Sequence, residues 1–172
     1  MGFSGHFIVV RAERPATELS TFRAVVTTPW WSARDGDWQI LQLSVRADPG
    51  AAGGLPPAPI VTETGAPALV MYVHDSDVVA VEAAGPSGLT WHCVLSPEMA
   101  RDYEVPEEQI GDPDEVTGNA VAWAEEAGLR PDPVAVRATL EAECDPLAEG
   151  LVFDLVHALG FRFGPGENLP TF

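Results

Sequence analysis

The first half of the chain groups its apolar residues in short runs typical of β-strands. Residues 6–11 form one such run, residues 22–28 are rich in β-branched and aromatic side chains, and residues 38–46 alternate apolar with polar positions. An Asp35-Gly36 step separates the second and third runs, and Gly tolerates the positive φ of a tight turn. We therefore predict three strands, the last two joined as a hairpin.

Residues 15–23 have a second interpretation, because Pro15 could open a short helical turn. Residues 48–59 consist of Ala, Gly and Pro with a single Leu, which predicts a loop. Residues 60–64 precede Gly65, with Pro67 just beyond. This order is typical of the end of a short helix.

The clearest pattern is a three-stranded meander over residues 68–73, 78–81 and 89–95, with polar turns between the runs. In the last run Cys93 shares a face with Leu89, Trp91 and Leu95, whereas His92 lies on the other face, because side chains alternate along a strand.

After residue 97 the apolar period changes to that of helices. Four dipeptides combine a capping side chain with a Pro at a first helical position: Ser96-Pro97, Asp112-Pro113, Asp132-Pro133 and Asp145-Pro146. The second of these helices carries an apolar stripe made of Val116, Ala120, Trp123, Ala124 and Ala127. The last, residues 146–159, is almost entirely apolar and is predicted to be the most buried.

Strands followed by helices predict an α+β fold, a largely antiparallel sheet of about five to six strands with three to four C-terminal helices packed on one face. The 172 residues suit one domain. Within it, residues 1–97 would be mainly strands, 98–160 mainly helices, and 161–172 an extended tail.

Charge is distributed unevenly. The formal net charge is −17, with 26 acidic side chains against nine Arg and no Lys, and residues 98–172 contribute −13 of it. Such a surface repels phosphate backbones and anionic lipid, which argues against nucleic-acid and membrane partners, and it attracts cations and basic proteins. The alternative is a solvated surface that only maintains solubility.

The N-terminal segment and the two cysteines bear on where in the cell the protein is expected. The N-terminus does not have the basic and apolar regions of a secretory signal, and no apolar stretch could span a bilayer. A cytoplasmic protein is therefore expected. Cys93 and Cys144 are the two cysteines, which are too few for a disulfide framework and are expected to be buried and reduced.

Catalytic candidates are weak. Cys93 beside His92 suggests an activated thiol, but the two lie on opposite strand faces, so another histidine such as His74 would have to approach. On the last helix Asp154 and His157 stand three residues apart and could pair. The alternative is a simple pair on the helix surface.

Three further residues could hold a divalent metal: His74, Asp75 and Asp77 occupy one turn. Asp and Ser also form tight turns by bonding their own backbone, and a calcium loop needs more oxygen ligands than this segment offers. No cofactor is predicted.

Two groups are candidate binding residues. Trp30 and Trp31 are consecutive, so one indole could face solvent as a contact anchor, unless both cover the sheet edge. The second group is an acid-rich stretch without Arg, comprising Glu104, Glu107, Glu108, Asp112, Asp114 and Glu115.

From these features we expect an acidic, non-catalytic binding or inhibitor-like protein that recognises a basic protein surface. The alternatives are a small enzyme or small-ligand protein with a pocket between sheet and helices, and a divalent-metal regulator. The sequence does not predict an oligomeric state.

Overall fold

The structure is a computed structural model that describes residues 2–23, 27–45 and 55–168. Its strands are β1 (Gly5–Arg11), β2 (Thr27–Asp35), β3 (Trp38–Val45), β4 (Ala68–His74), β5 (Val78–Ala84), β6 (Thr90–Leu95) and the short β7 (Glu167–Asn168). Its helices are the 3₁₀ turn η1 (Ala16–Glu18), α1 (Ser20–Arg23), α2 (Pro57–Thr64), α3 (Pro97–Asp102), α4 (Glu107–Ile110), α5 (Pro113–Glu126), α6 (Pro133–Glu141) and α7 (Glu149–Ala158).

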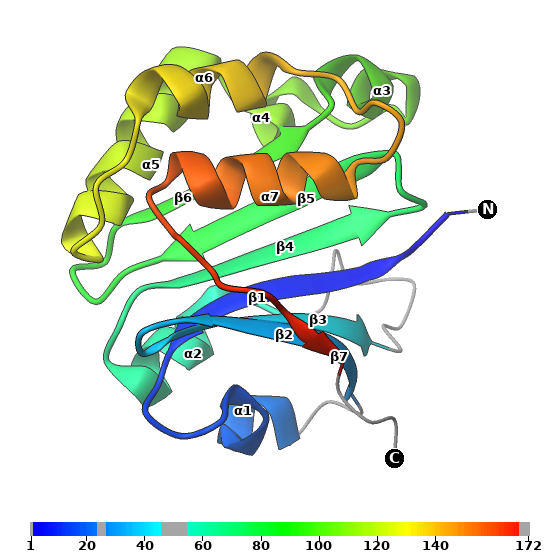
Figure 1. Ribbon diagram of the computed structural model, residues 1–172. Coiled ribbons are helices and arrows are strands. Elements are labelled where there is room, and N and C mark those ends of the chain that lie inside the picture. The colour runs from blue at the N-terminus through cyan, green and yellow to red at the C-terminus, as the bar shows by residue number, and fades with distance from the viewer. Residues whose placement is uncertain (1, 24–26, 46–54, 169–172) are drawn as a thin grey trace.

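All strand pairs in the sheet are antiparallel, in the order β6-β5-β4-β1-β3-β2-β7. The meander β4-β5-β6 and the β2-β3 hairpin are both present, and Gly36 has the positive φ of 59° that the hairpin turn requires. The predicted α+β class with a largely antiparallel sheet is therefore confirmed. After α7 the chain crosses β1 and reaches the β2 edge as β7 (Figure 1).

One face of the sheet packs against α5, α6 and α7, which contribute to the largest apolar core. Trp123 is fully buried there, and its indole N–H donates to the Ala84 carbonyl oxygen at 2.9 Å. The predicted stripe on α5 is buried throughout. Hydrophobic burial of this stripe accounts for the position of α5 over the sheet.

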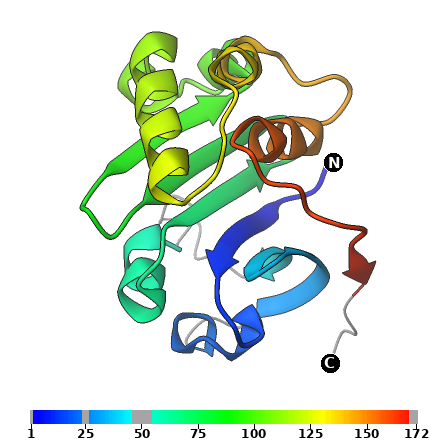
Figure 2. The ribbon, with the colours of Figure 1, turned by 60° about the vertical axis from the view of Figure 1, so that its left-hand side comes forward.

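The opposite face carries a second, smaller core under η1, α1 and α2. Strand alternation explains the division, since Phe7 and Val9 face the larger core while Ile8 and Val10 face the smaller one. In Figure 2 the blue α1 and teal α2 lie together, apart from the yellow and orange helices.

Two predicted elements are wrong. Phe22 does not begin a strand. It lies buried in α1, so the helical interpretation of residues 15–23 is correct, and β2 begins at Thr27. Asp145-Pro146 does not begin the last helix, which starts at Glu149.

The edges of other elements also differ. β2 continues to Asp35, so the hairpin turn is limited to residues 36 and 37, and the predicted loop 48–59 ends where α2 begins at Pro57. Positions 48–54 of that loop lie outside the described residues. Within the acidic stretch, residues 107–110 form α4, which the sequence did not indicate.

Candidate functional site

The sheet face opposite α5–α7 is hollowed by a groove of about 340 Å³, between the α2 side and the α3–α4 segment. This volume lies at the lower end of the range of small-molecule sites. The lining is mostly apolar and comprises His6, Leu55, Val70, Tyr72, His74, Val78, Ala80, Glu82, Val94, Tyr103, Val105 and Gln109.

The floor of the groove is set by strand register. His6 on β1 pairs with Tyr72 on β4, Tyr72 pairs with Ala80 on β5, and Ala80 pairs with Val94 on β6. Paired residues share a face about 5 Å apart. Ala80 thus lies between a large ring and a branched side chain, and its short, exposed methyl group leaves room between them.

The wall from the α3–α4 segment is tied to the sheet at both ends. The Tyr103 hydroxyl donates to Asp77 Oδ2 at 2.7 Å, and this bond to a carboxylate raises the pKa of Tyr103. At the other end His92 Nε2 donates to the Glu108 carbonyl oxygen at 3.0 Å. These two polar contacts add to the apolar packing of Ala100 and Ile110 against Val78 and Val94, which joins the same segment to the sheet.

Four rings run through the groove in sequence. The ring centroids of His6 and Tyr72 are 4.9 Å apart, those of Tyr72 and His74 are 6.4 Å apart, and those of His74 and Tyr103 are 5.5 Å apart. Aromatic rings offer flat apolar faces on which other rings pack edge-to-face or offset. The arrangement suits contact with a planar or compact apolar group.

Glu82 is the acidic side chain of the groove. It pairs in register with Val70 and His92 and is exposed. Within the described part of the chain its carboxylate makes no hydrogen bond or ion pair. It is therefore available to a ligand.

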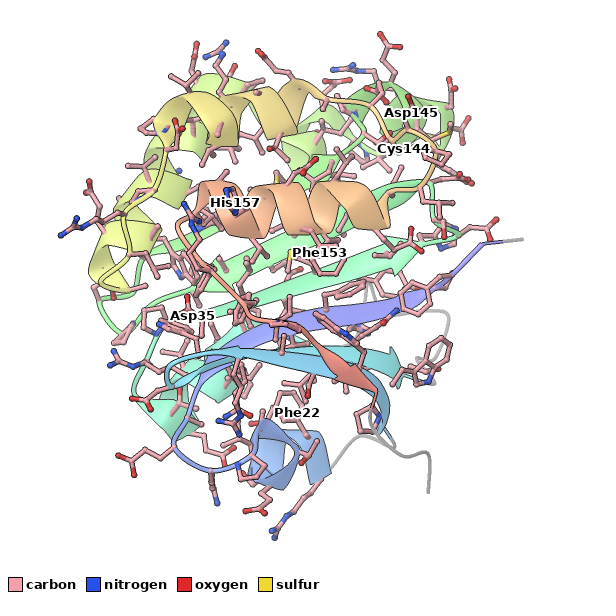
Figure 3. All side chains as sticks on the ribbon, viewed as in Figure 1. Phe22, Asp35, Cys144, Asp145, Phe153 and His157 are labelled. Atoms are coloured by element: carbon pink, nitrogen blue, oxygen red, sulfur yellow. The ribbon has the colours of Figure 1, made fainter. Side chains whose placement is uncertain are left out.

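The catalytic candidates do not converge. Of the four histidines and Cys93, only His6 and His74 line the groove. Cys93 faces the opposite core, where burial raises the pKa of its thiol to about 12. A thiol with that pKa is a poor nucleophile at neutral pH. His157 lies on α7, away from this face (Figure 3).

Asp154 and His157 are both exposed on α7, and among the residues described no hydrogen bond or ion pair joins them. The His157 carbonyl oxygen instead accepts from the Arg162 guanidinium at 2.9 Å. The pair proposed from helical spacing thus has no contact that would orient the imidazole.

The turn that suggested a metal site uses its polar groups structurally. Asp75 Oδ1 accepts from the Gly2 amide at 2.7 Å, and Asp77 binds Tyr103 as described above. Ser76, buried between them, accepts from the Phe3 amide and donates to Glu149. In the described ranges no group of three or more His, Cys, Asp or Glu could hold a metal.

The acidic stretch divides into two kinds of carboxylate. Glu107 and Asp114 form ion pairs with Arg101 and Arg137, respectively, and Asp112 caps α5 by accepting from two backbone amides. The Arg101 hydrogen bond lowers the pKa of Glu107. The other three, Glu104, Glu108 and Glu115, are exposed, and none of their side chains has an ion pair in the described residues.

The two tryptophans lie at the far end of the sheet from this stretch. A β-bulge between Pro29 and Trp31 makes Trp30 the extra residue. Trp30 is 43% exposed, with its ring 5.5 Å from that of Phe3, whereas Trp31 is half-buried, with its ring 5.8 Å from that of Phe153.

Trp31 is also covered by the C-terminal segment. A Cβ at Gly166 would come within 1.8 Å of the Trp31 indole, so this close approach requires glycine. One indole is thus exposed and the other is covered. Phe153, which packs on Trp31, projects from α7 (Figure 3).

Among the groove residues, His74 was a candidate from the sequence, as a catalytic or metal-binding side chain, whereas Tyr72, Ala80, Glu82 and Tyr103 were not predicted. One signal was present, because residues 78–84 alternate and place Ala80 and Glu82 on the face opposite Val79 and Val81. The segments that cover parts of that face are α2 and the α3–α4 segment. They come from distant parts of the chain, so the local pattern did not indicate them.

Within the described ranges, no helix has the length and apolar character needed to cross a membrane. Comparison of the chain with protein-family models, with curated proteins and with solved structures found no match.

Proposed function

We propose that this protein is a non-catalytic binding protein whose groove on the β4-β5-β6 face holds a small, largely apolar, ring-containing molecule. The observation that carries the proposal is the groove itself, which combines an apolar floor at Ala80 with a row of rings and with polar groups at its ends. Concave, mostly apolar sites with a few placed polar groups are the usual form of small-molecule sites.

A binding role is favoured over catalysis by the chemistry of the lining. The groove contains two imidazoles, two phenols and one carboxylate, but no thiol or aliphatic hydroxyl, among the residues described. The hydroxyl of Tyr103, the phenol on the wall, already donates a hydrogen bond to Asp77. Binding needs only complementary shape and polarity, and the groove supplies both.

The experiment is to screen small aromatic compounds for binding by ligand-observed NMR, with Ala80→Trp as the test variant. The indole would fill the floor, so compounds that occupy the groove should lose binding. Affinities of roughly millimolar strength are expected of ligands with so few atoms. Ala80→Leu serves as a milder second variant if the Trp variant does not fold.

The matched control is Ala122→Leu, an exposed Ala on α5 outside the groove. It should leave binding unchanged. Loss of binding in both Ala80 variants but not in the control supports the proposal. Compounds that bind the Ala80 variants as well as the wild type would contradict it.

A second candidate function is recognition of a basic protein by the acidic helical part of the chain. The exposed carboxylates of Glu104, Glu108 and Glu115, which have no arginine partners among the described residues, favour it. Association with a deca-arginine peptide should weaken as salt rises and should fall when these three residues are changed to Gln. Association that is indifferent to both would remove this candidate.

Trp30 is too far from the acidic helical part of the chain to anchor the same basic partner. β2 and β6 stand five strand positions apart in the sheet, a separation of about 24 Å at the usual strand spacing. A partner that uses both features would have to span the whole sheet.

A further inference from the structure

We infer that the molecule held in the groove is an organic cation, an amine or guanidine attached to an aromatic or apolar body, and that Glu82 binds its charged group. This inference rests on the proposed function of the groove and names the class of ligand it would select. The charges that line and surround the groove support this assignment.

The first step is the isolation of Glu82. Its neighbours across the strands are Val70, which is apolar, and His92, whose Nε2 is already used by the Glu108 carbonyl oxygen. No arginine lines the groove in the part of the chain that the structure describes, and the sequence contains no lysine. A ligand cation is the charge partner that this carboxylate lacks.

The second step is the position of Glu82 at one end of the groove. Glu82 pairs with His92, which bonds Glu108, and Gln109 follows directly on the same wall. Tyr103 is fixed at the opposite end by its bond to Asp77. A ligand can therefore place its body over Ala80 and Tyr72 while its charged end reaches the carboxylate and the Gln109 amide oxygen.

The third step is the electrostatic field of the acidic side chains around the groove. Asp75 and Asp77 flank the turn at one end, and Glu104 and Glu108 lie on the wall segment. With a net charge of −17 the chain attracts cations and repels anions of the same size. Charge complementarity thus favours a cationic ligand over neutral or anionic ones.

The test compares three probes that share a phenyl ring on a short chain and carry a cationic, a neutral or an anionic end group: 2-phenylethylamine, 2-phenylethanol and phenylacetate. Wild-type protein should bind the amine about tenfold more tightly than the alcohol, and phenylacetate should bind weakest. Glu82→Gln should reduce amine affinity to the level of the alcohol and leave alcohol binding unchanged. Glu125→Gln, an exposed acid on α5 outside the groove, removes the same charge and should change little.

The outcomes separate this inference from the function on which it rests. If both Ala80 variants abolish binding of all probes but Glu82→Gln has no selective effect, the groove is a ligand site and the cation assignment is overturned. An equal loss in Glu125→Gln would also overturn it, since the general field and not Glu82 would be responsible. If no probe binds wild type, or if the Ala80 variants bind normally, both proposals fail.

Occupation of the groove by a second copy of the chain is a further outcome that the experiment distinguishes. In that case sedimentation would show a wild-type dimer that becomes monomeric with Ala80→Trp, and the small-cation inference would be overturned. A protein whose mass is the same in both forms, and whose amine binding is lost only in the variant, supports it.

Discussion

Glu63 offers a sharp test of how the α2 side of the groove is held. Its carboxylate accepts five hydrogen bonds, two each from Ser20 and Thr21 and one from Arg14, all between 2.7 and 3.1 Å. These bonds join α2 to α1, and Leu55 lines the groove just before α2 begins. Glu63→Gln removes the charge and replaces one acceptor oxygen by a donor.

The magnitude follows from the donors left unsatisfied. In either orientation the Gln amide turns an N–H toward at least one backbone amide that had been paired. An unpaired donor costs about 1–3 kcal/mol, and bonds to a charged group are the stronger kind. Because the Glu63 side chain is 16% exposed, water can replace part of the loss. We expect a destabilisation of about 2 kcal/mol, or roughly 4–8 °C in Tm for a chain of this length.

The pH dependence gives an independent check. The hydrogen bonds, led by that from the Ser20 amide, lower the pKa of Glu63 from 4.5 to about 2. A carboxyl group with a depressed folded-state pKa stabilises the fold above its unfolded pKa and loses that contribution as pH falls through the folded value. The difference between wild type and Glu63→Gln should therefore be full above pH 5 and shrink between about pH 4.5 and pH 2.

The assay is urea unfolding followed by tryptophan fluorescence at pH 7 and at pH 2.5. Glu18→Gln is the matched control, because Glu18 is exposed on the neighbouring 3₁₀ turn and its side chain has no hydrogen bond in the described residues. A Glu63→Gln protein as stable as the control at pH 7 would refute the argument. So would a stability loss of the same size at both pH values.

Two further predictions concern cysteine reactivity and the turn at Ser76. In native protein at pH 8, iodoacetamide should alkylate half-buried Cys144 before Cys93, because the buried Cys93 thiol has a pKa of about 12. Mass spectrometry that finds Cys93 modified first would contradict this. Ser76→Ala should destabilise the fold by about 1–3 kcal/mol in thermal unfolding, because the Phe3 amide and the Glu149 carboxylate both lose a hydrogen-bond partner. An unchanged Tm would count against the structural role of this turn.

Local patterns predicted the elements whose stabilising contacts are local. Asp112 and Asp132 each cap a helix by accepting from amides two and three residues ahead, and such bonds can be expected from the sequence alone. Ser96 behaves differently. Its backbone is left-handed, and its hydroxyl makes no capping bond.

The cap of α3 comes from a distant residue. Glu143 accepts from the Glu98 amide at 2.9 Å and from the Ser96 hydroxyl at 2.7 Å. A carboxylate about 45 residues away leaves no signal in a local window, so the sequence could predict where α3 begins but not what caps it.

The groove was beyond sequence reasoning for the same physical reason. Its floor requires the registers of four strands at once, and its walls come from segments before α2 and after α3. The alternation around Ala80 and Glu82 indicated a second face of the sheet. It could not indicate that helices cover only part of that face.

The most direct test of the ligand groove is the map of amide chemical-shift changes when 2-phenylethylamine is added to isotope-labelled protein. The account predicts that the changes concentrate at Tyr72, Ala80, Glu82 and Val94, on neighbouring strands of one face, and that Ala80→Trp abolishes them. Changes that fall instead around the acidic helices or Trp30, or that survive in the variant, would contradict the assignment of this groove as the functional site.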